Sequence, residues 1–245
     1  ISGKTTTLYS MLSEVDSKEN NIITIEDPIE YHLSGISQIQ VSNKKGLTFA
    51  AGLRSLLRQD PDIMMVGEIR DEETARISIQ AALTGHLVLS TLHTNDSAGA
   101  VTRMLDIGVE PYLVASSLIG VIAQRLVRLI CPECREDFDP DVETLAELKE
   151  LKLSIDDFPR RKLARGRGCD NCFNTGYTGR TAIYEILKVN EPIREMIVER
   201  ASASVIKKAA LAAGLITLRG DGIIKVKEGK TTVEEVLRVT QMDME

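Results

Sequence analysis

The sequence predicts an α/β fold in which helices cover a parallel β-sheet. In the first 130 residues, short β-branched and aliphatic runs alternate with helical patterns, and polar or acidic residues follow these runs. Alternating strands and helices are typical of parallel sheets, which bind ligands at the carboxyl ends of their strands. Because 43% of the residues are hydrophobic but only 4% are aromatic, we expect an aliphatic core.

Three buried strands are expected in this part of the chain, because three apolar runs are short and contain many aliphatic residues. They lie at 22–25, 63–66 and 87–89.

Helices are expected between these runs. A helix over 6–15 starts the chain, and a leucine pattern over 47–58 has helical spacing. Acidic residues at 71–73 are expected to begin the next helix, because negative charge is favourable at the positive, N-terminal end of a helix dipole. Ser97 can cap the helix after that one.

The C-terminal third is expected to be helical from Ile183 onward. Thr232 precedes Glu235 by three residues, which is the spacing of a capping box for a last helix over 233–239.

Residues 3–6, Gly-Lys-Thr-Thr, match the end of the P-loop pattern G-x-x-x-x-G-K-[ST]. In that pattern amides around Gly3 face the β-phosphate, Lys4 reaches the β and γ oxygens, and Thr5 ligates Mg²⁺. The helix from Thr6 would present its positive end to the phosphates. Taken alone, these four residues favour a Thr-capped helix start instead.

The acidic residues after the predicted strands favour the interpretation of residues 3–6 as a phosphate-binding loop over that of a capped helix start. A P-loop enzyme needs a carboxylate at the end of a neighbouring strand to hold Mg²⁺ or to activate water. Glu68 follows one strand and His93 follows another, whereas Glu26, Asp27 and Glu30 follow a third. An ordinary surface acid could explain Glu68 by itself, but it does not explain this coincidence.

Two Cys-x-x-Cys pairs separated by residues 135–168 indicate a closed, structural Zn²⁺ site. A disulfide framework is typical of secreted proteins, and no leader opens this chain. Unliganded thiols and a thioredoxin-like redox pair are the other interpretations, although neither pair follows a βαβ start. The metal ligands would be Cys131, Cys134, Cys169 and Cys172.

Several longer segments resemble the secretion ATPases, the hexameric motors of type II secretion and type IV pilus assembly. The segment Leu-Arg-Gln-Asp-Pro-Asp-Ile-Met-Met-Val-Gly-Glu-Ile-Arg-Asp is similar to their signature, and others resemble their aspartate and histidine boxes. These segments together cover nearly the whole chain. They lie at 26–30, 57–71, 84–96, 124–128, 218–222 and 231–237.

The resemblance implies a RecA-like P-loop ATPase core at 1–129, a zinc-binding insert at 130–175 and a helical C-terminal subdomain at 176–245. It implies ATP, Mg²⁺ and Zn²⁺ as cofactors and a homo-hexamer as the assembly. It also implies a cytoplasmic position at the bacterial inner membrane, beside a membrane platform protein and a membrane-anchored docking protein. Secretion and pilus-assembly motors carry the four-cysteine element, which pilus-retraction motors usually lack.

Site residues carry over position by position. Glu68 is the Walker B acid, and either Glu30 or Glu68 would activate water. His93 is a candidate sensor of the γ-phosphate, and His86 is a weaker one. The nucleotide-binding set is Gly3, Lys4, Thr5, Thr6, Glu26 and Asp27. Four arginines could complete the site of a neighbouring subunit, but we assign this role to none of them: Arg54, Arg58, Arg70 and Arg76.

Two other functions stay open: a RecA-like translocase on nucleic acid and a non-catalytic scaffold of the same fold. The formal net charge of −6 and the lack of basic segments with interleaved aromatics disfavour direct nucleic-acid binding. The joint presence of Lys4, Glu30, Glu68 and His93 disfavours a scaffold. The longest apolar stretch, 112–123, is too short for a transmembrane helix of about 20 residues.

The first glycine of the P-loop pattern would precede Ile1. We therefore expect the 245 residues to begin inside the P-loop, after the N-terminal docking region, and to bind ATP weakly by themselves. The sequence leaves open whether type II secretion or pilus assembly is served.

Overall fold

The computed structural model describes residues 3–42, 44 and 46–240. They group into two compact units. We call Gly3–Val121 with Leu187–Ala213 the sheet unit, and Ile122–Ile186 with the described residues from Gly214 on the cysteine unit. This grouping cuts across the three expected segments, whose bounds stay a prediction.

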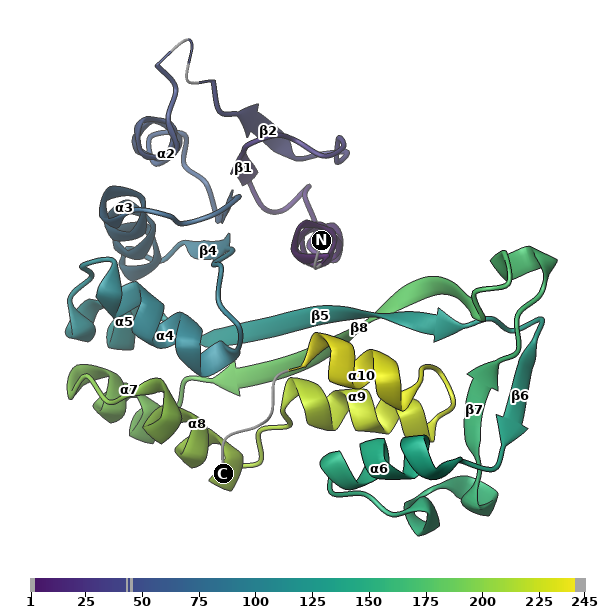
Figure 1. Ribbon diagram of the computed structural model, residues 1–245. Helices are drawn as coiled ribbons and strands as arrows, with labels where there is room; N and C mark the ends of the chain where they lie inside the picture. Colours follow the sequence, from purple (N-terminus) through teal and green to yellow (C-terminus); the bar gives the residue numbers. More distant parts are fainter. Residues whose placement is uncertain (1–2, 43, 45, 241–245) are drawn as a thin grey trace. The chain divides into compact units, whose positions relative to one another are not determined.

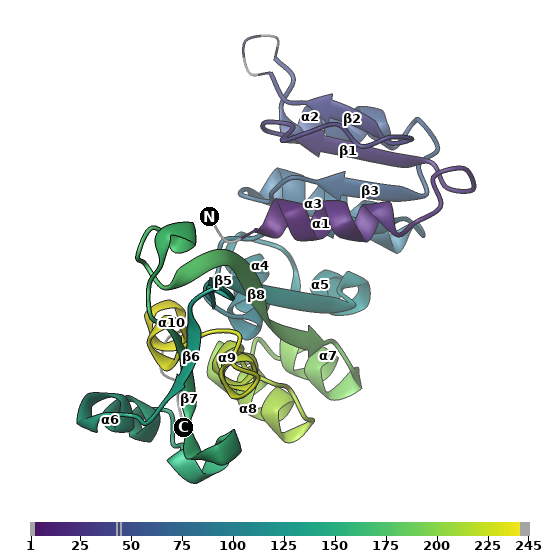
Figure 2. The same cartoon turned by 90° about the vertical axis from the view of Figure 1, so that its right-hand side faces the viewer.

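A four-stranded parallel sheet with the order β2-β1-β3-β4 forms the centre of the sheet unit (Figure 1 and Figure 2). Strands β1 (Ile22–Glu26), β3 (Ile63–Val66) and β4 (Leu87–Ser90) confirm the predicted strands. Strand β2 (Ser37–Gln40) was not expected, because its sequence Ser-Gln-Ile-Gln contains no apolar run.

The expectation that the third strand is buried was wrong. Leu87 is 40% exposed, and the rest of β4 is half-buried. Among the described residues, β4 pairs with β3 alone and therefore forms an edge of the sheet.

Helix α1 (Lys4–Ser13) covers one face of the sheet, and α2 (Phe49–Leu56) and α3 (Glu72–Leu83) cover the other (Figure 2). Side chains alternate between the two faces of a strand. Ile22 and Met65 accordingly pack with Leu12 of α1. Ile25 points to the opposite face, where a Cβ on Gly52 of α2 would lie 2.1 Å from its Cδ1 atom.

Four further helices complete the sheet unit: α4 (Ser97–Asp106), α5 (Pro111–Ser117), α7 (Glu191–Val198) and α8 (Ala203–Ala212). Helix α5 packs on α7, and α4 packs on α8. The cap of α4 is Asp96, not Ser97 as expected: its carboxylate accepts from the Gly99 amide at 2.8 Å, and Ser97 is already helical and buried.

The prediction of helix from Ile183 onward was also wrong. Strand β8 (Tyr177–Lys188) continues to Lys188 and pairs with β5 (Gly120–Ile130) in a long ribbon. Burial alternates along β8, with Ile183 and Leu187 buried and Ile186 exposed. Because apolar residues occupy both faces of this strand, the sequence hides its two-residue period.

In the cysteine unit, β6 (Arg135–Phe138) and β7 (Leu163–Gly166) form an antiparallel pair. The helices are α6 (Val142–Glu150), α9 (Leu218–Lys227) and α10 (Val233–Val239). Single 3₁₀ turns lie at Ile155–Asp157, Pro159–Arg161 and Asp170–Cys172. The core joins these elements through Leu148, Phe158, Val226 and Val236.

The start of α10 confirms half of the predicted capping box. Thr232 is the cap, because its hydroxyl accepts from the Glu235 amide at 3.3 Å. The Glu235 side chain does not return to Thr232. It is fully buried and accepts from Arg128 on β5 and Arg238 on α10.

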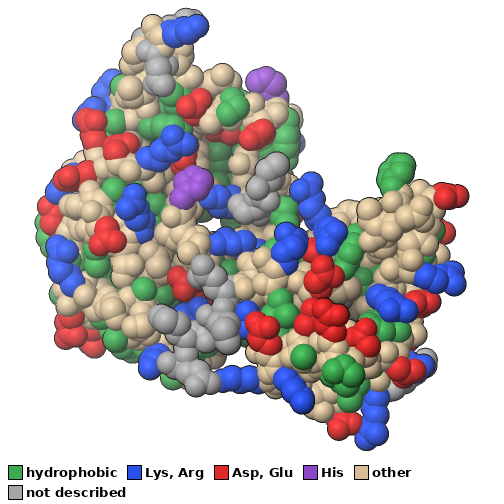
Figure 3. Space-filling model, in the orientation of Figure 1, with side chains coloured by type: hydrophobic (Ala, Val, Ile, Leu, Met, Phe, Trp, Pro, Cys, Tyr) green, Lys and Arg blue, Asp and Glu red, His purple; other side chains and the backbone are tan. Residues whose placement is uncertain are grey.

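Within the described residues, no helix combines the length and apolarity that a membrane span requires. On the face drawn in Figure 3, acidic and basic side chains are interspersed within each unit. Neither unit presents there the continuous basic surface that nucleic-acid binding uses.

Candidate functional site

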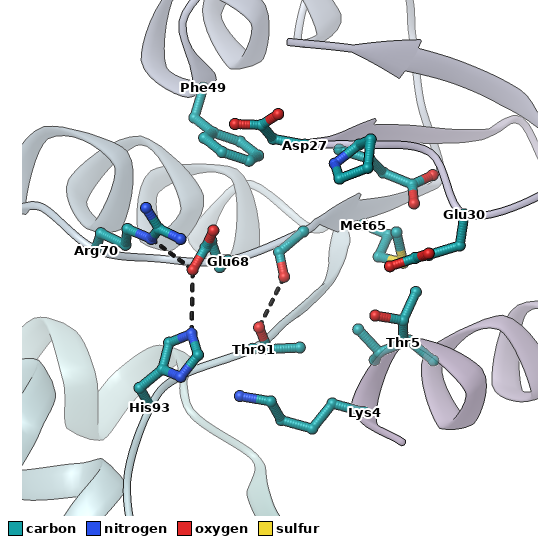
Figure 4. A pocket seen from close by; sticks show the side chains of 14 residues that line it. Lys4, Thr5, Asp27, Glu30, Phe49, Met65, Glu68, Arg70, Thr91 and His93 are labelled. Carbon is teal, nitrogen blue, oxygen red and sulfur yellow. Dashed lines mark hydrogen bonds and ion pairs between the residues drawn. The ribbon is translucent and has the colours of Figure 1, made fainter. Parts of the chain in front are cut away.

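A pocket lies at the edge of the sheet where the carboxyl ends of β1, β3 and β4 meet (Figure 4). Its charged and polar lining side chains come from α1, from the last residue of β1 and from the loops after these three strands. They are Lys4, Thr5, Glu26, Asp27, Glu30, Glu68, Arg70, Thr91 and His93. Residues distant in sequence are thus brought together, as the polar residues after the strands predicted.

The first turn of α1 forms one wall of the pocket. Gly3 adopts a left-handed conformation with φ of 73°, which suits glycine at a tight turn. The ammonium of Lys4 donates to the Leu92 carbonyl at 2.9 Å and so reaches the loop after β4. Amides at the start of a helix attract anions. Gly3 and Thr6 border this turn without lining the pocket, and Thr6 is exposed.

Glu68 lies between a guanidinium group, that of Arg70, and an imidazole ring, that of His93. One of its carboxylate oxygens, Oε2, is 2.6 Å from Nε of Arg70 and 3.2 Å from Nε2 of His93 (Figure 4). The hydrogen bond with Glu68 raises the pKa of the Arg70 guanidinium. The Glu68 side chain is only 14% exposed, so these partners hold it at the pocket wall.

Gly67 explains why the acid occupies position 68. Its amide donates to the Ile25 carbonyl at 2.8 Å, and a Cβ on Gly67 would lie 3.3 Å from that same oxygen. A larger residue at this point would press against β1, whereas Glu68 follows where the chain leaves the sheet.

The three acids after β1 differ in their surroundings. Glu26 is 2% exposed, and both of its carboxylate oxygens accept hydrogen bonds from within the sheet unit. Asp27 and Glu30 are exposed and line the pocket. In Figure 4 the Glu30 carboxylate extends toward Thr5.

His86 lies outside this pocket. It precedes β4 and therefore lies at the amino ends of the strands, whereas the pocket lies at their carboxyl ends. Its Nδ1 atom is 2.8 Å from the Ala81 carbonyl at the end of α3. His93, after the same strand, lines the pocket. Two histidines that flank one strand can thus lie at its opposite ends.

Of the four arginines, Arg70 lines the pocket. Arg54 pairs with Glu73, and Arg76 pairs with Glu72 and Glu110. Sequence reasoning missed the partnership of Arg70 with Glu68, although a two-residue spacing on one loop allows such a contact. Arg58 contacts Ser55 at 3.5 Å.

The four cysteines form a separate cluster in the cysteine unit, with all four sulfurs within 4.8 Å of one another. Cys131 and Cys169 are 3.9 Å apart, and Cys134 and Cys172 are also 3.9 Å apart. Tetrahedral Zn²⁺ with Zn–S bonds of about 2.3 Å places its sulfurs roughly 3.8 Å apart, whereas a disulfide requires about 2.05 Å. The cluster is therefore compatible with a metal site.

Hydrogen bonds to sulfur suit thiolate ligands. The amides of Gly168 and Gly176 donate to Cys134 and Cys172 at 3.2 and 3.3 Å. The Thr178 hydroxyl is the main cause that lowers the pKa of Cys131 to about 6. These donors stabilise negative charge on sulfur, although burial raises the pKa of Cys134 to about 11.

Comparison with known proteins places this chain among secretion proteins. The family model described as "Type II/IV secretion system protein" matches residues 2–238. Type II secretion system protein E of Pseudomonas aeruginosa is 53% identical over 98% of this chain and 47% of its own length. Type IV pilus assembly ATPase PilB of Thermus thermophilus is 52% identical over 98% of this chain and 26% of its own length.

A solved structure agrees with the sequence comparison. The crystal structure of the pilus retraction motor PilT with bound ADP superposes with a TM-score of 0.70 at 29% identity, covering 98% of this chain and 58% of that one. The fold is thus that of the P-loop ATPases, as the sequence predicted. This chain spans about half the length of the type II relatives it matches. It belongs to the type II/IV secretion system protein family.

Proposed function

We propose that this chain forms the ATP-hydrolysing part of a motor for type II protein secretion or type IV pilus assembly. The observation that carries the proposal is the pocket itself, where Lys4 and Thr5 face Glu30, Glu68 and His93 across one edge of the sheet. Supporting it, relatives over 50% identical are named for secretion and pilus assembly, and the solved relative binds ADP.

The side chains divide the work of hydrolysis between them. Lys4, with the amides that begin α1, would bind the β- and γ-phosphates, and Thr5 with Glu68 would hold Mg²⁺. When bound, Mg²⁺ neutralises charge that develops on the phosphates. Glu30, which extends toward Thr5, is our candidate to accept the proton of the attacking water, because Glu68 is already engaged by Arg70 and His93.

The His93 imidazole would act as a sensor that contacts the γ-phosphate and, through its hydrogen bond, Glu68. Its Nε2 atom is 3.2 Å from the carboxylate, and the ring is largely exposed at the pocket. Loss of the γ-phosphate would change the partners of both side chains. Gly3, Thr6 and Asp27 are proposed to support nucleotide binding from the rim.

Phosphate release from Mg-ATP tests the proposal, measured in a version of the protein that extends before Ile1 and so includes the whole expected P-loop. Lys4→Ala should lower the rate at least about 100-fold, since a preorganised charge on the phosphates is lost. Lys18→Ala removes an exposed lysine after the same helix and is the matched control, which we expect to keep the parent rate. Equal rates for Lys4→Ala and the parent protein would refute the proposed role of the pocket.

The assembly is proposed to be a homo-hexamer at the cytoplasmic side of the bacterial inner membrane. A membrane platform protein and a membrane-anchored docking protein would be its partners. The support is the family membership and the names of the relatives.

We further propose that the cysteine cluster holds one structural Zn²⁺. Four thiolates leave no open coordination position, which suits a structural rather than catalytic ion. Protein purified without chelator should contain about one zinc per chain by mass spectrometry. Cys134→Ser should lose the metal and lower the melting temperature, because binding energy of a structural zinc is folding energy. A metal-free parent protein with the same melting temperature as Cys134→Ser would contradict the proposal.

A further inference from the structure

We infer that Tyr9 is a positioning residue that ties the loop carrying Glu30 to the helix carrying Lys4 and Thr5. The inference rests on the proposed function, since Glu30 requires positioning only if the pocket hydrolyses ATP. Tyr9 lies on α1, five residues after Lys4, and its side chain is fully buried.

The Tyr9 hydroxyl joins Glu26 to the main chain of Glu30. It donates to the Glu26 carboxylate and accepts from the Glu30 amide at 3.4 Å. The Nε2 atom of Gln38 also lies 3.4 Å away, but its two hydrogens have shorter contacts with Glu26 and the Tyr31 carbonyl. A phenol has one hydrogen to donate and can accept two hydrogen bonds. Three segments of the chain, α1, the end of β1 and the loop that carries Glu30, therefore meet at this one oxygen.

Glu26 fixes the direction of the Tyr9 hydroxyl. Its other oxygen accepts from the Thr24 hydroxyl at 2.6 Å and from Gln38 Nε2 at 3.1 Å. A buried carboxylate has to be hydrogen-bonded, because an unpaired one is costly. Glu26 therefore holds the phenol proton, and the lone pairs of the Tyr9 oxygen stay available to the Glu30 amide.

Gln38 provides a second anchor for the same loop. Its carbonyl oxygen accepts from the Leu33 amide at 2.7 Å, and its Nε2 atom donates to the Tyr31 carbonyl at 3.2 Å. The Tyr31 ring meets the Tyr9 ring edge-on, with centroids 4.7 Å apart. The loop after β1 is thus held at Glu30 by Tyr9 and just after Glu30 by Gln38.

The consequence is a fixed frame between the phosphate-binding turn and the candidate base. Lys4 and Thr5 begin the helix whose Tyr9 binds the Glu30 main chain. A displacement of about 1 Å in such a frame can cost roughly 100-fold in rate. Burial, and then the hydrogen bond with Glu26, raises the pKa of Tyr9 to about 12, so the phenol keeps its proton over the working range of pH.

Tyr9→Phe removes the hydroxyl and keeps the ring in the core. We expect kcat for ATP to fall about 10- to 100-fold, with KM and the affinity for a non-hydrolysable ATP analogue changed less than about threefold. Tyr112→Phe makes the same chemical change at an exposed tyrosine of α5 and should match the parent protein. An unchanged kcat for Tyr9→Phe would overturn the inference.

A double-substitution cycle asks whether Tyr9 acts through Glu30. On a Glu30→Gln background, Tyr9→Phe should lower the residual rate less than about twofold, because residues that act as a unit are not additive. A full additional loss would show that Tyr9 acts elsewhere and would overturn the inference.

Two further outcomes separate the possible failures. If Tyr9→Phe does not fold, Gln38→Met removes the second anchor, and it should lower kcat at constant KM; an unchanged kcat there would overturn the inference. With all variants made in a version of the protein that extends before Ile1, an inactive parent protein would refute the proposed function, whereas an active parent with a normal Tyr9→Phe rate would refute only the positioning role.

Discussion

At the scale of single residues, the side chain of Glu235 shows how a buried charge is accommodated. Both of its oxygens accept from Arg238, and both also accept from Arg128, one through the amide and one through the guanidinium. Burial alone would raise the pKa of Glu235, but the hydrogen bonds from Arg238 and Arg128 outweigh it and lower the pKa to about 2.

This lowered pKa predicts the acid sensitivity of the cysteine unit. A carboxyl whose pKa is lower in the folded state stabilises the protein above its unfolded pKa near 4.5, and this contribution is lost as the pH falls from there toward 2. Glu235→Gln should lower the free energy of unfolding at pH 7 by about 2 kcal/mol. Denaturant titrations from pH 7 to pH 3 measure both effects.

The substitution should also flatten the pH dependence below pH 4.5, because the titrating group is gone. Glu234→Gln is the neighbouring control, since that side chain is exposed at the start of α10. Identical acid profiles for Glu235→Gln and the parent protein would contradict this account of the ion pair.

The sequence predicted which residues line the candidate site better than it predicted the contacts that these residues make. Glu68, Glu30, His93, Lys4 and Thr5 were expected together and line one pocket. The position of His86 could not be predicted, because both ends of a strand look alike in sequence. The network around Tyr9 was missed because it depends on the pairing of β1 with β2.

At the scale of elements, strong local signals gave correct predictions. Helix α3 begins after Asp71, whose carboxylate accepts from the Thr74 amide at 2.8 Å, and α2 lies within the leucine-patterned segment 47–58 as expected. Strand β2 and the end of β8 were missed because one is polar and the other is apolar on both faces. Their conformations are set by partner strands rather than by local sequence.

Close backbone contact is another feature that local patterns do not reveal. A Cβ on Gly166 of β7 would lie 2.0 Å from the carbonyl oxygen of Gly176, next to the second cysteine pair. Gly176 adopts φ of 76°, in the left-handed region. These glycines let two chain segments pass close enough for the four sulfurs to gather, so the cluster depends on more than cysteine spacing.

At the scale of the whole molecule, the chain comprises a sheet unit with the candidate hydrolytic site and a cysteine unit with the candidate metal site. The family and the P-loop fold followed from long motifs in the sequence. The grouping of 187–213 with the sheet unit did not, because it depends on contacts of α7 with α5 and of α8 with α4.

The central claim is that the pocket at the carboxyl edge of the sheet hydrolyses ATP with Glu68 at its centre. The most direct measurement compares ATP binding and ATP turnover in Glu68→Gln and in the parent protein, both in a version that extends before Ile1. For Glu68→Gln we predict an ATP affinity within about threefold of the parent protein and a turnover lowered by at least about 100-fold. The reason is that the negative charge of Glu68 acts mainly in the transition state. Turnover near that of the parent protein would contradict the account.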